Sequence, residues 1–299
     1  KDVFLLLRLS GDSLMELYSY NIPTNDEMIL MPIGDIQWAG DEEEVAIGML
    51  KKHIAWGVEN NARFIGMGDY IDSFSPSNRE SLRGAKIYDT GRKVIENAGR
   101  GMVQELYDRA VESSKGRWLG LLEGHHFCEY TNGTTSDQHL CELLETPFLG
   151  TCAYVRLKFA HPNGTTGEVL IWAHHGHGGG SRAGSPLNKL ELAAAQWPGD
   201  IFLMGHNHKK LATAIDRPFP IWCGKQPKLL HRTTLLVCTG GFLKGYGEGR
   251  VQGGIPRGSY VEQKMLPPVA LGGPVIYIKP RWKEHDGTKV WQPDLRVSN

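Results

Sequence analysis

Residues 63–72 read RFIGMGDYID, an apolar run that passes directly into a turn with two aspartates. The run at 63–67 predicts a buried β-strand, and the Gly-Asp pair after it is typical of a turn. The same arrangement occurs at 28–37, where an apolar run ends in Gly-Asp-Ile-Gln. Helical segments are predicted at 42–59 and 96–115, between and after these strands. This strand–helix–strand order predicts a layered α/β fold.

Strands become more frequent than helices in the rest of the chain. Predicted strands lie at 118–122, 154–159, 168–173, 201–204, 235–239 and 275–278, and predicted helices at 137–144 and 189–196. A Pro-Asn-Gly turn at 162–164 joins two of these strands. No linker divides the chain. We therefore expect an α/β (α+β) fold class and a single domain over residues 1–299.

Composition excludes several classes of protein. The 299 residues carry 33 Lys and Arg against 33 Asp and Glu, so the net charge is zero and a generally basic nucleic-acid coat is disfavoured. The apolar run at 3–7 is too short to span a bilayer and lacks the features of a signal peptide. The five cysteines are scattered, with no C-x-x-C, which favours reduced thiols. These features predict a cytoplasmic protein without a membrane partner.

Histidines and aspartates gather at the ends of the predicted strands. Seven of the 12 histidines form three clusters, each beginning within three residues of a strand end: His125 and His126; His174, His175 and His177; His206 and His208. Aspartates follow the first two strands in the same way: Asp35 after the first, Asp69 and Asp72 after the second. Because ligands of open α/β sheets bind at the carboxyl ends of the strands, we expect these side chains to meet at one rim.

This donor set is typical of a metal site. Imidazole nitrogens and carboxylate oxygens suit Zn, Mn and Fe, and the absence of Cys from every cluster disfavours a structural zinc finger. The clusters hold more ligands than one tetrahedral ion needs. Two ions about 3.5–4 Å apart would use them all, and such pairs clamp the attacking and leaving oxygens of an in-line displacement at phosphorus.

The order of these motifs resembles the calcineurin-like metallophosphoesterase superfamily. The family pattern is D-x-H, G-D-x-x-D, G-N-H-[DE], a strand-end His followed by Gly, and G-H-x-H. The corresponding segments here are 35–37, DIQ; 68–72, GDYID; 124–127, GHHF; 175–176, HG; and 205–208, GHNH. The matched motifs span residues 35–208. The resemblance implies a β-sandwich of two mixed sheets flanked by helices, with residues 209–299 completing the second sheet and supplying lid loops.

The resemblance also implies roles for individual residues. One metal would be held by Asp35, Gln37, Asp69 and His208, and the other by Asp69, His125, His175 and His206, with Asp69 as the bridge. The family His near the substrate corresponds to His126, which would act as a general acid or stabilise charge on the phosphoryl oxygens. The second Asp of its motif corresponds to Asp72, which would orient a ligand or the adjacent turn.

The chain departs from the family pattern at three positions. An amide oxygen from Gln37 would replace the usual imidazole. This change would weaken binding of the first metal and favour Mn or Mg. An imidazole at His125 replaces the usual Asn and can still ligate, whereas Phe127 replaces the usual acid. Either His174 or His175 could be the strand-end ligand, and the following Gly favours His175.

The function that we expect is hydrolysis of phosphate esters by hydroxide activated between two divalent metal ions. Manganese is the preferred metal, with Zn, Fe or Mg as alternatives, and a small phosphodiester or nucleotide-like compound is the preferred substrate. Composition gives no support for a nucleic-acid partner, and the oligomeric state stays open. The alternative is a non-catalytic binding scaffold that keeps the phosphoesterase fold with an altered metal site.

Overall fold

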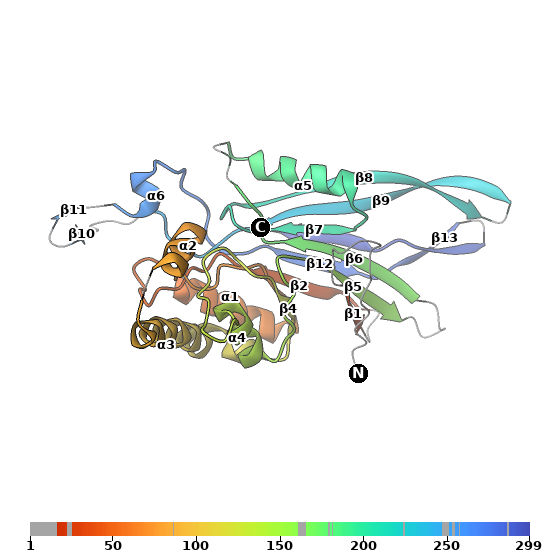
Figure 1. Cartoon of the computed structure of the whole chain (residues 1–299). Coiled ribbons are helices and arrows are strands. Elements are labelled where there is room, and N and C mark those ends of the chain that lie inside the picture. Colours follow the sequence, from red (N-terminus) through yellow and green to blue (C-terminus); the bar gives the residue numbers. More distant parts are fainter. Residues whose placement is uncertain are drawn as a thin grey trace.

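The computed structural model describes residues 17–22, 26–85, 87–160, 166–178, 180, 182–223, 225–246, 251–252, 255–256, 258–285 and 287–299. Two large sheets lie face to face within this part of the chain, and helices cover their outer sides (Figure 1). The expected mixed α/β class with two mixed sheets is confirmed at this level. The turn predicted at 162–164 lies outside the described residues.

The first sheet has five strands in the order β15-β12-β2-β3-β4. Their bounds are β2 Met28–Ile33, β3 Arg63–Gly66, β4 Trp118–Leu121, β12 Val275–Lys279 and β15 Asp294–Ser298. Strands β2, β3 and β4 run parallel, so their carboxyl ends lie at one edge. The apolar runs that predicted these three strands are almost entirely buried, as expected for strands covered on both faces.

The second sheet has six strands in the order β1-β5-β6-β7-β9-β8. Their bounds are β1 Leu17–Ile22, β5 Cys152–Ala160, β6 Thr166–His174, β7 Ile201–Met204, β8 Lys210–Cys223 and β9 Gln226–Thr239. Strands β6 and β7 are parallel and again place their carboxyl ends side by side. Residues beyond 209 therefore supply strands to both sheets, β8 and β9 to this one and β12 and β15 to the other.

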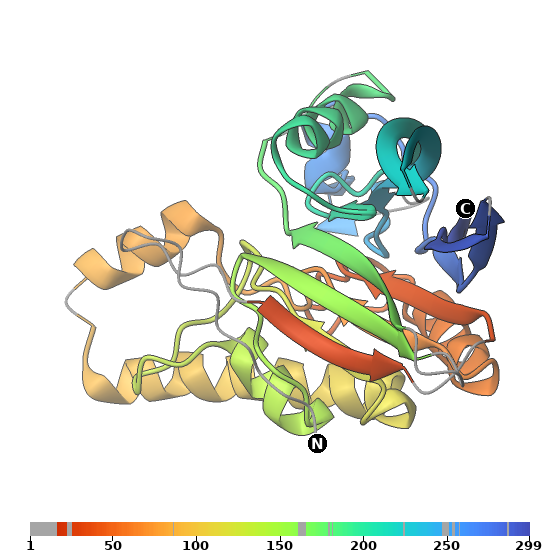
Figure 2. The same cartoon turned by 90° about the vertical axis from the view of Figure 1, so that its right-hand side faces the viewer.

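Three hydrophobic layers hold the sheets and helices together. Alternate residues of both sheets, such as Leu30 and Val155, fill the space between them. Helices α1 (Ile47–Glu59), α3 (Asp89–Leu106) and α4 (Ser136–Leu144) pack on the outer face of the five-stranded sheet. Helix α5 (Ser185–Gln196) covers the outer face of the six-stranded sheet. Figure 2 shows α3 and α5 on opposite sides of the two sheets. None of the described helices is both long and apolar enough to cross a membrane.

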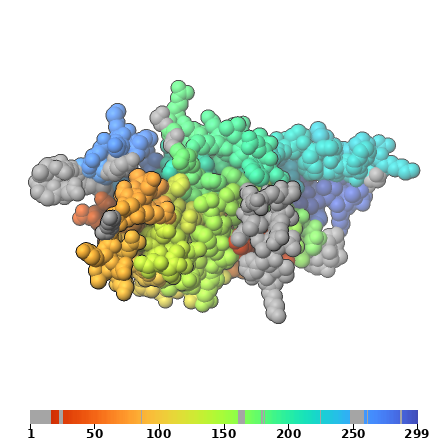
Figure 3. Space-filling model, in the orientation of Figure 1, coloured from red at the N-terminus to blue at the C-terminus, as the bar shows by residue number. Residues whose placement is uncertain are grey.

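Several elements differ from the sequence-based expectation. The first helix begins at Ile47 rather than at 42, because residues 42–44 form a turn. The second begins at Asp89 and gives way after Leu106 to a π-helical turn, Tyr107–Val111. Elements that were not predicted are β1, α2 (Pro76–Gly84), β8, β10 (Val251–Gln252), β11 (Ile255–Pro256), α6 (Tyr260–Gln263), β13 (Trp282–His285), β14 (Thr288–Trp291) and β15. The longest of these, β8, pairs with β9 along its whole length, and the hairpin projects from the body of the molecule (Figure 3).

Candidate metal centre

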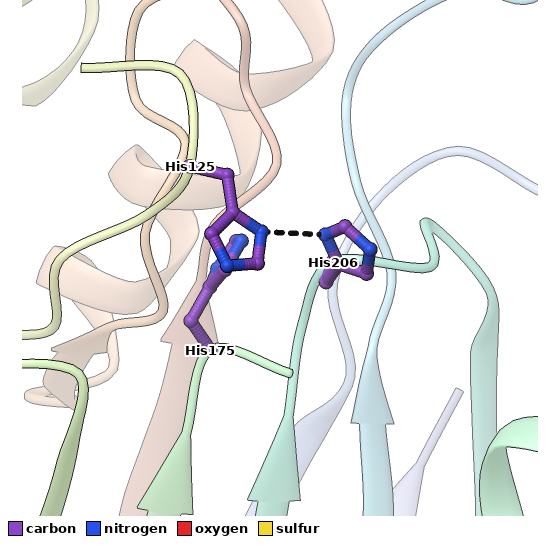
Figure 4. A group of neighbouring side chains, drawn as sticks. All are labelled: His125, His175 and His206. Atoms are coloured by element: carbon purple, nitrogen blue, oxygen red, sulfur yellow. Dashed lines mark hydrogen bonds between the residues drawn. The ribbon is translucent and has the colours of Figure 1, made fainter. Parts of the chain in front are cut away.

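Five strand ends bring the predicted ligands to one rim of the molecule. The segments that follow β2, β3 and β4 carry Asp35, Asp69 and His125, and those that follow β6 and β7 carry His175 and His206. Figure 4 shows the three histidines pointing toward one another from loops of both sheets. The rim therefore lies where the two sheets of the sandwich face each other.

The first group of converging donors consists of His125, His175 and His206. One ring nitrogen of each lies within 4.8 Å of the others. The Nδ1 atoms of His125 and His206 are 3.1 Å apart. The His125 ring also stands edge-on to the His175 ring, at a centroid distance of 4.6 Å. Three imidazoles in this arrangement form a set of nitrogen donors suited to a transition metal or zinc.

The second group, Asp35, Asp69 and His175, shares His175 with the first. One donor atom from each again lies within 4.8 Å of the others, and all three residues are at most 2% exposed. The His175 Nε2 atom lies 3.4 Å from Asp69 Oδ2. His208 extends this group, because its Nε2 lies 3.8 Å from Asp35 Oδ1. Two buried carboxyl groups side by side can both be ionised only beside compensating positive charge, which a divalent cation supplies.

The environment of His175 fits a metal ligand. Its Nδ1 lies 2.6 Å from the Met67 carbonyl oxygen, so that nitrogen carries a hydrogen and donates it. The opposite nitrogen, Nε2, is buried and has no hydrogen-bond partner among the described residues. Metal-binding histidines are typically held in this way, with one nitrogen donating to a carbonyl and the other free to ligate. The donor set present here therefore fits a divalent metal ion.

The Asp69 carboxylate is held by the loop after β4. Its Oδ1 accepts hydrogen bonds from the backbone N–H groups of His125 and His126, the second at 3.0 Å. Burial raises the pKa of Asp69, but the adjacent His175 ring and the hydrogen bonds from the backbone outweigh burial and hold the pKa well below its usual range. Asp69 is therefore ionised. Gly124 makes this contact possible, since a Cβ there would lie 2.1 Å from Asp69 Oδ1.

The backbone of the site is strained. Eight of the described non-glycine residues have a positive φ angle, and five of these are predicted ligands: Asp35, Gln37, Asp69, His206 and His208. Non-glycine residues reach this left-handed region at an energetic cost, and they cluster at functional sites where the surrounding structure holds them. Here backbone hydrogen bonds hold them, for example from Asp35 N to Gly68 O and from Gln37 N to Asp69 O.

Burial changes the protonation of the site in two ways: it favours neutral histidines and also a protonated Asp35. It lowers the pKa of His125, His206 and His208 to about 4, so these rings are neutral at pH 7. Burial also raises the pKa of Asp35 to about 8. For His175, burial lowers the pKa, but the Asp69 carboxylate raises it further, to about 9. Without metal, Asp35 and His175 each hold a proton at neutral pH.

His126 and Asp72 form a pair on the more exposed side of the rim. The His126 Nδ1 atom lies 2.7 Å from Asp72 Oδ1. Burial lowers the pKa of His126, but this hydrogen bond outweighs it, so the pKa lies above the ordinary value. A cationic imidazole that keeps Nε2–H available can donate a proton to a leaving oxygen. The structure thus brings together the two residues whose roles the family pattern implied.

The remaining candidate residues lie around these groups. Gln37 is buried, and its backbone N–H donates a hydrogen bond to the Asp69 carbonyl oxygen. Of the two adjacent histidines, His175 and not His174 belongs to the donor groups. The His174 Nδ1 atom accepts a hydrogen bond from Gly176 N, and its ring stacks on Trp172. His177 is exposed, with its ring 6.2 Å from that of His206.

Two further residues support the site in a way that the sequence did not indicate. Asp137 is buried, and its Oδ2 accepts a hydrogen bond of 2.9 Å from Gly124 N. The Arg79 guanidinium donates to the carbonyl oxygens of His125 and Phe127 and lies over the Phe127 ring. Both residues therefore fix the loop that holds Asp69. The capping box Thr135–Gln138 at the start of α4 is a sequence signal that places Asp137, whereas Arg79 has no comparable signal.

Comparisons with known proteins add no information about this site. Neither a search against models of protein families nor a search against curated proteins found a match for the chain.

Proposed function

We propose that this chain is a metal-dependent phosphoesterase with the fold and site of the calcineurin-like metallophosphoesterase superfamily. One observation carries the proposal: donors from five strand ends converge on His175, whose buried Nε2 has no hydrogen-bond partner in the described part of the chain. A bound cation explains why these donor side chains converge on a nitrogen that makes no hydrogen bond.

The donors divide into two sets that share Asp69. Asp35, Gln37, Asp69 and His208 would hold one ion, and Asp69, His125, His175 and His206 the other. Divalent ions in these positions would lower the pKa of bound water and neutralise charge on the phosphoryl oxygens. Mixed oxygen and nitrogen donors are compatible with manganese, and also with zinc, iron or magnesium.

The chain itself supplies the proton for the leaving oxygen. The Asp72 carboxylate holds the His126 ring by its Nδ1–H, so the Nε2–H faces away from Asp72. His126 donates this second proton as the ester bond breaks, because an alcohol leaves as the neutral molecule more easily than as the alkoxide. The backbone of the same residue donates to Asp69, so the proton donor and the shared ligand move as one unit.

The test is hydrolysis of aryl phosphate mono-, di- and triesters by purified protein with Mn²⁺, Zn²⁺ or Mg²⁺. We expect metal-dependent release of the aryl alcohol, fastest with a diester, and loss of nearly all activity in Asp69→Asn. The matched control is Asp216→Asn, which alters an exposed aspartate paired with His231 on the β8–β9 hairpin. Tight metal binding without turnover of any ester would support the non-catalytic scaffold instead.

A further inference from the structure

The tip of the β8–β9 hairpin carries an exposed apolar face. The cross-strand pairs Pro220–Leu229 and Trp222–Pro227 place these four side chains on one face, next to Pro218. All five are exposed, and Trp222 and Leu229 are 69% and 62% exposed. The opposite face of the tip, with Phe219 and Leu230, is more buried. An exposed tryptophan and leucine side by side on a projecting arm indicate an interaction surface.

The outer part of the β8–β9 hairpin, residues 217–232, carries charge of one sign only. Residues 217–232 contain four Lys and Arg and no Asp or Glu, in a chain whose net charge is zero. Arg232 pairs with Asp200 at the base, at 2.6 Å, and the Arg217 guanidinium lies over the Phe202 ring of β7, so Lys225 is the cation at the turn itself. Lys225 is exposed. The partner of this tip is therefore expected to be both apolar and anionic at its surface.

We propose that the hairpin tip docks on an anionic lipid surface, which departs from the composition-based prediction of no membrane partner. Tryptophan prefers the interface between water and hydrocarbon, and leucine and proline side chains can enter the acyl region. Lysines beside such residues bind anionic headgroups. In this arrangement Trp222 and Leu229 insert, while Lys225 contacts the headgroups.

Other partners fit the tip less well. Added β-strands need N–H donors along the free edge, and Pro218 and Pro220 in the edge strand β8 have none. Nucleic acids need cations on the contacting face, whereas this face consists of apolar side chains. A stable dimer buries about 20–30 residues on each side, and the apolar face supplies five.

Docking by the tip leaves the metal centre in solution. The hairpin begins at Lys210, directly beyond His208, and β8 has 14 residues. At a rise of about 3.4 Å per residue the tip lies about 45 Å along the arm from that end. The arm would thus hold the protein at a lipid surface without covering the rim, and the inference does not depend on the proposed phosphoesterase activity.

The experiment is cosedimentation of the full chain with vesicles of phosphatidylcholine, with and without phosphatidylglycerol. We expect binding that needs phosphatidylglycerol and falls about tenfold in the double variant Trp222→Ser, Leu229→Ser, from the lost apolar burial. Lys225→Glu should weaken binding by at least about fivefold. The matched control is Leu192→Ser, which alters a leucine of similar exposure, 64%, on α5. Quenching of tryptophan fluorescence by brominated lipid should be lost in Trp222→Phe.

Three results would overturn the proposal. The first is equal vesicle binding by the wild type and the double variant. The second is a dimer in light scattering that the double variant converts to a monomer, which would assign the face to a second copy of the chain. The third is binding of duplex or single-stranded DNA that the double variant loses while vesicles are not bound by either protein.

Discussion

Metal binding at neutral pH should release two protons from each chain. In the metal-free protein the pKa of Asp35 is about 8, because burial disfavours its carboxylate. The pKa of His175 is about 9, because the Asp69 carboxylate outweighs the opposing effect of burial. Both groups hold a proton at pH 7 and must lose it before they can bind a cation. His125, His206 and His208, with pKa values of about 4, are already neutral and release none.

The size of the effect follows from these values. Both pKa values are raised, so the proton-bound forms are present below them and affinity rises as the pH increases. At pH 7, the pKa of Asp35 lies about one unit above the pH and that of His175 about two units above it. Removing both protons therefore costs about 4 kcal/mol in total. The affinity for Mn²⁺ should therefore be about a thousandfold lower at pH 7 than above pH 9. In a plot against pH, the logarithm of this affinity should rise with a slope of about two below pH 8 and about one between pH 8 and pH 9.

Titration calorimetry in buffers of different ionisation enthalpy measures the released protons directly. The variant Asp69→Asn removes the charge that raises the pKa of His175, so NMR of the metal-free variant should show this ring titrating below 6.5. The exposed pair of Asp216 and His231 provides the matched control, since Asp216→Asn should leave the His175 pKa unchanged. An affinity that is independent of pH between 6 and 9, or an unshifted His175 in Asp69→Asn, would refute this reasoning.

Three further substitutions test individual parts of the site. His126→Ala should keep Mn²⁺ affinity in calorimetry and lower kcat by about 10²–10⁴; an unchanged kcat would exclude proton donation by this ring. Gly124→Ala should weaken Mn²⁺ binding at least tenfold, because the added Cβ would fall 2.1 Å from Asp69 Oδ1; wild-type affinity would show that the loop can move. Asp137→Ala should lower the free energy of unfolding by about 1–3 kcal/mol in urea, because Gly124 N loses its buried acceptor; no change would mean that water replaces the carboxylate.

The sequence predicted the strands near the site well because they are buried on both faces. The runs at 28–33 and 201–204 match β2 and β7 residue for residue. Such short, continuous apolar runs have one stable environment, between two layers. The aspartates and histidines directly after them were therefore placed at one rim from sequence alone.

The peripheral elements could not be predicted from apolar runs in this way. Strand β8 contains Pro218 and Pro220, residues that disfavour a strand, and it is tolerated only because it lies at the edge of the sheet. Helix α2 buries none of its residues and so has no apolar stripe to indicate it. The supporting role of Asp137 was missed for a different reason. Asp137 acts on the loop that holds Asp69 by accepting a hydrogen bond from the backbone of Gly124, and such a bond leaves no pattern in the sequence.

Anomalous diffraction from crystals grown with excess Mn²⁺ tests the central claim most directly. The account predicts two manganese peaks for each chain, with Asp69 bound to both and His175 Nε2 bound to one. A well-ordered rim with no peak within coordination distance of Asp69 and His175 would contradict it.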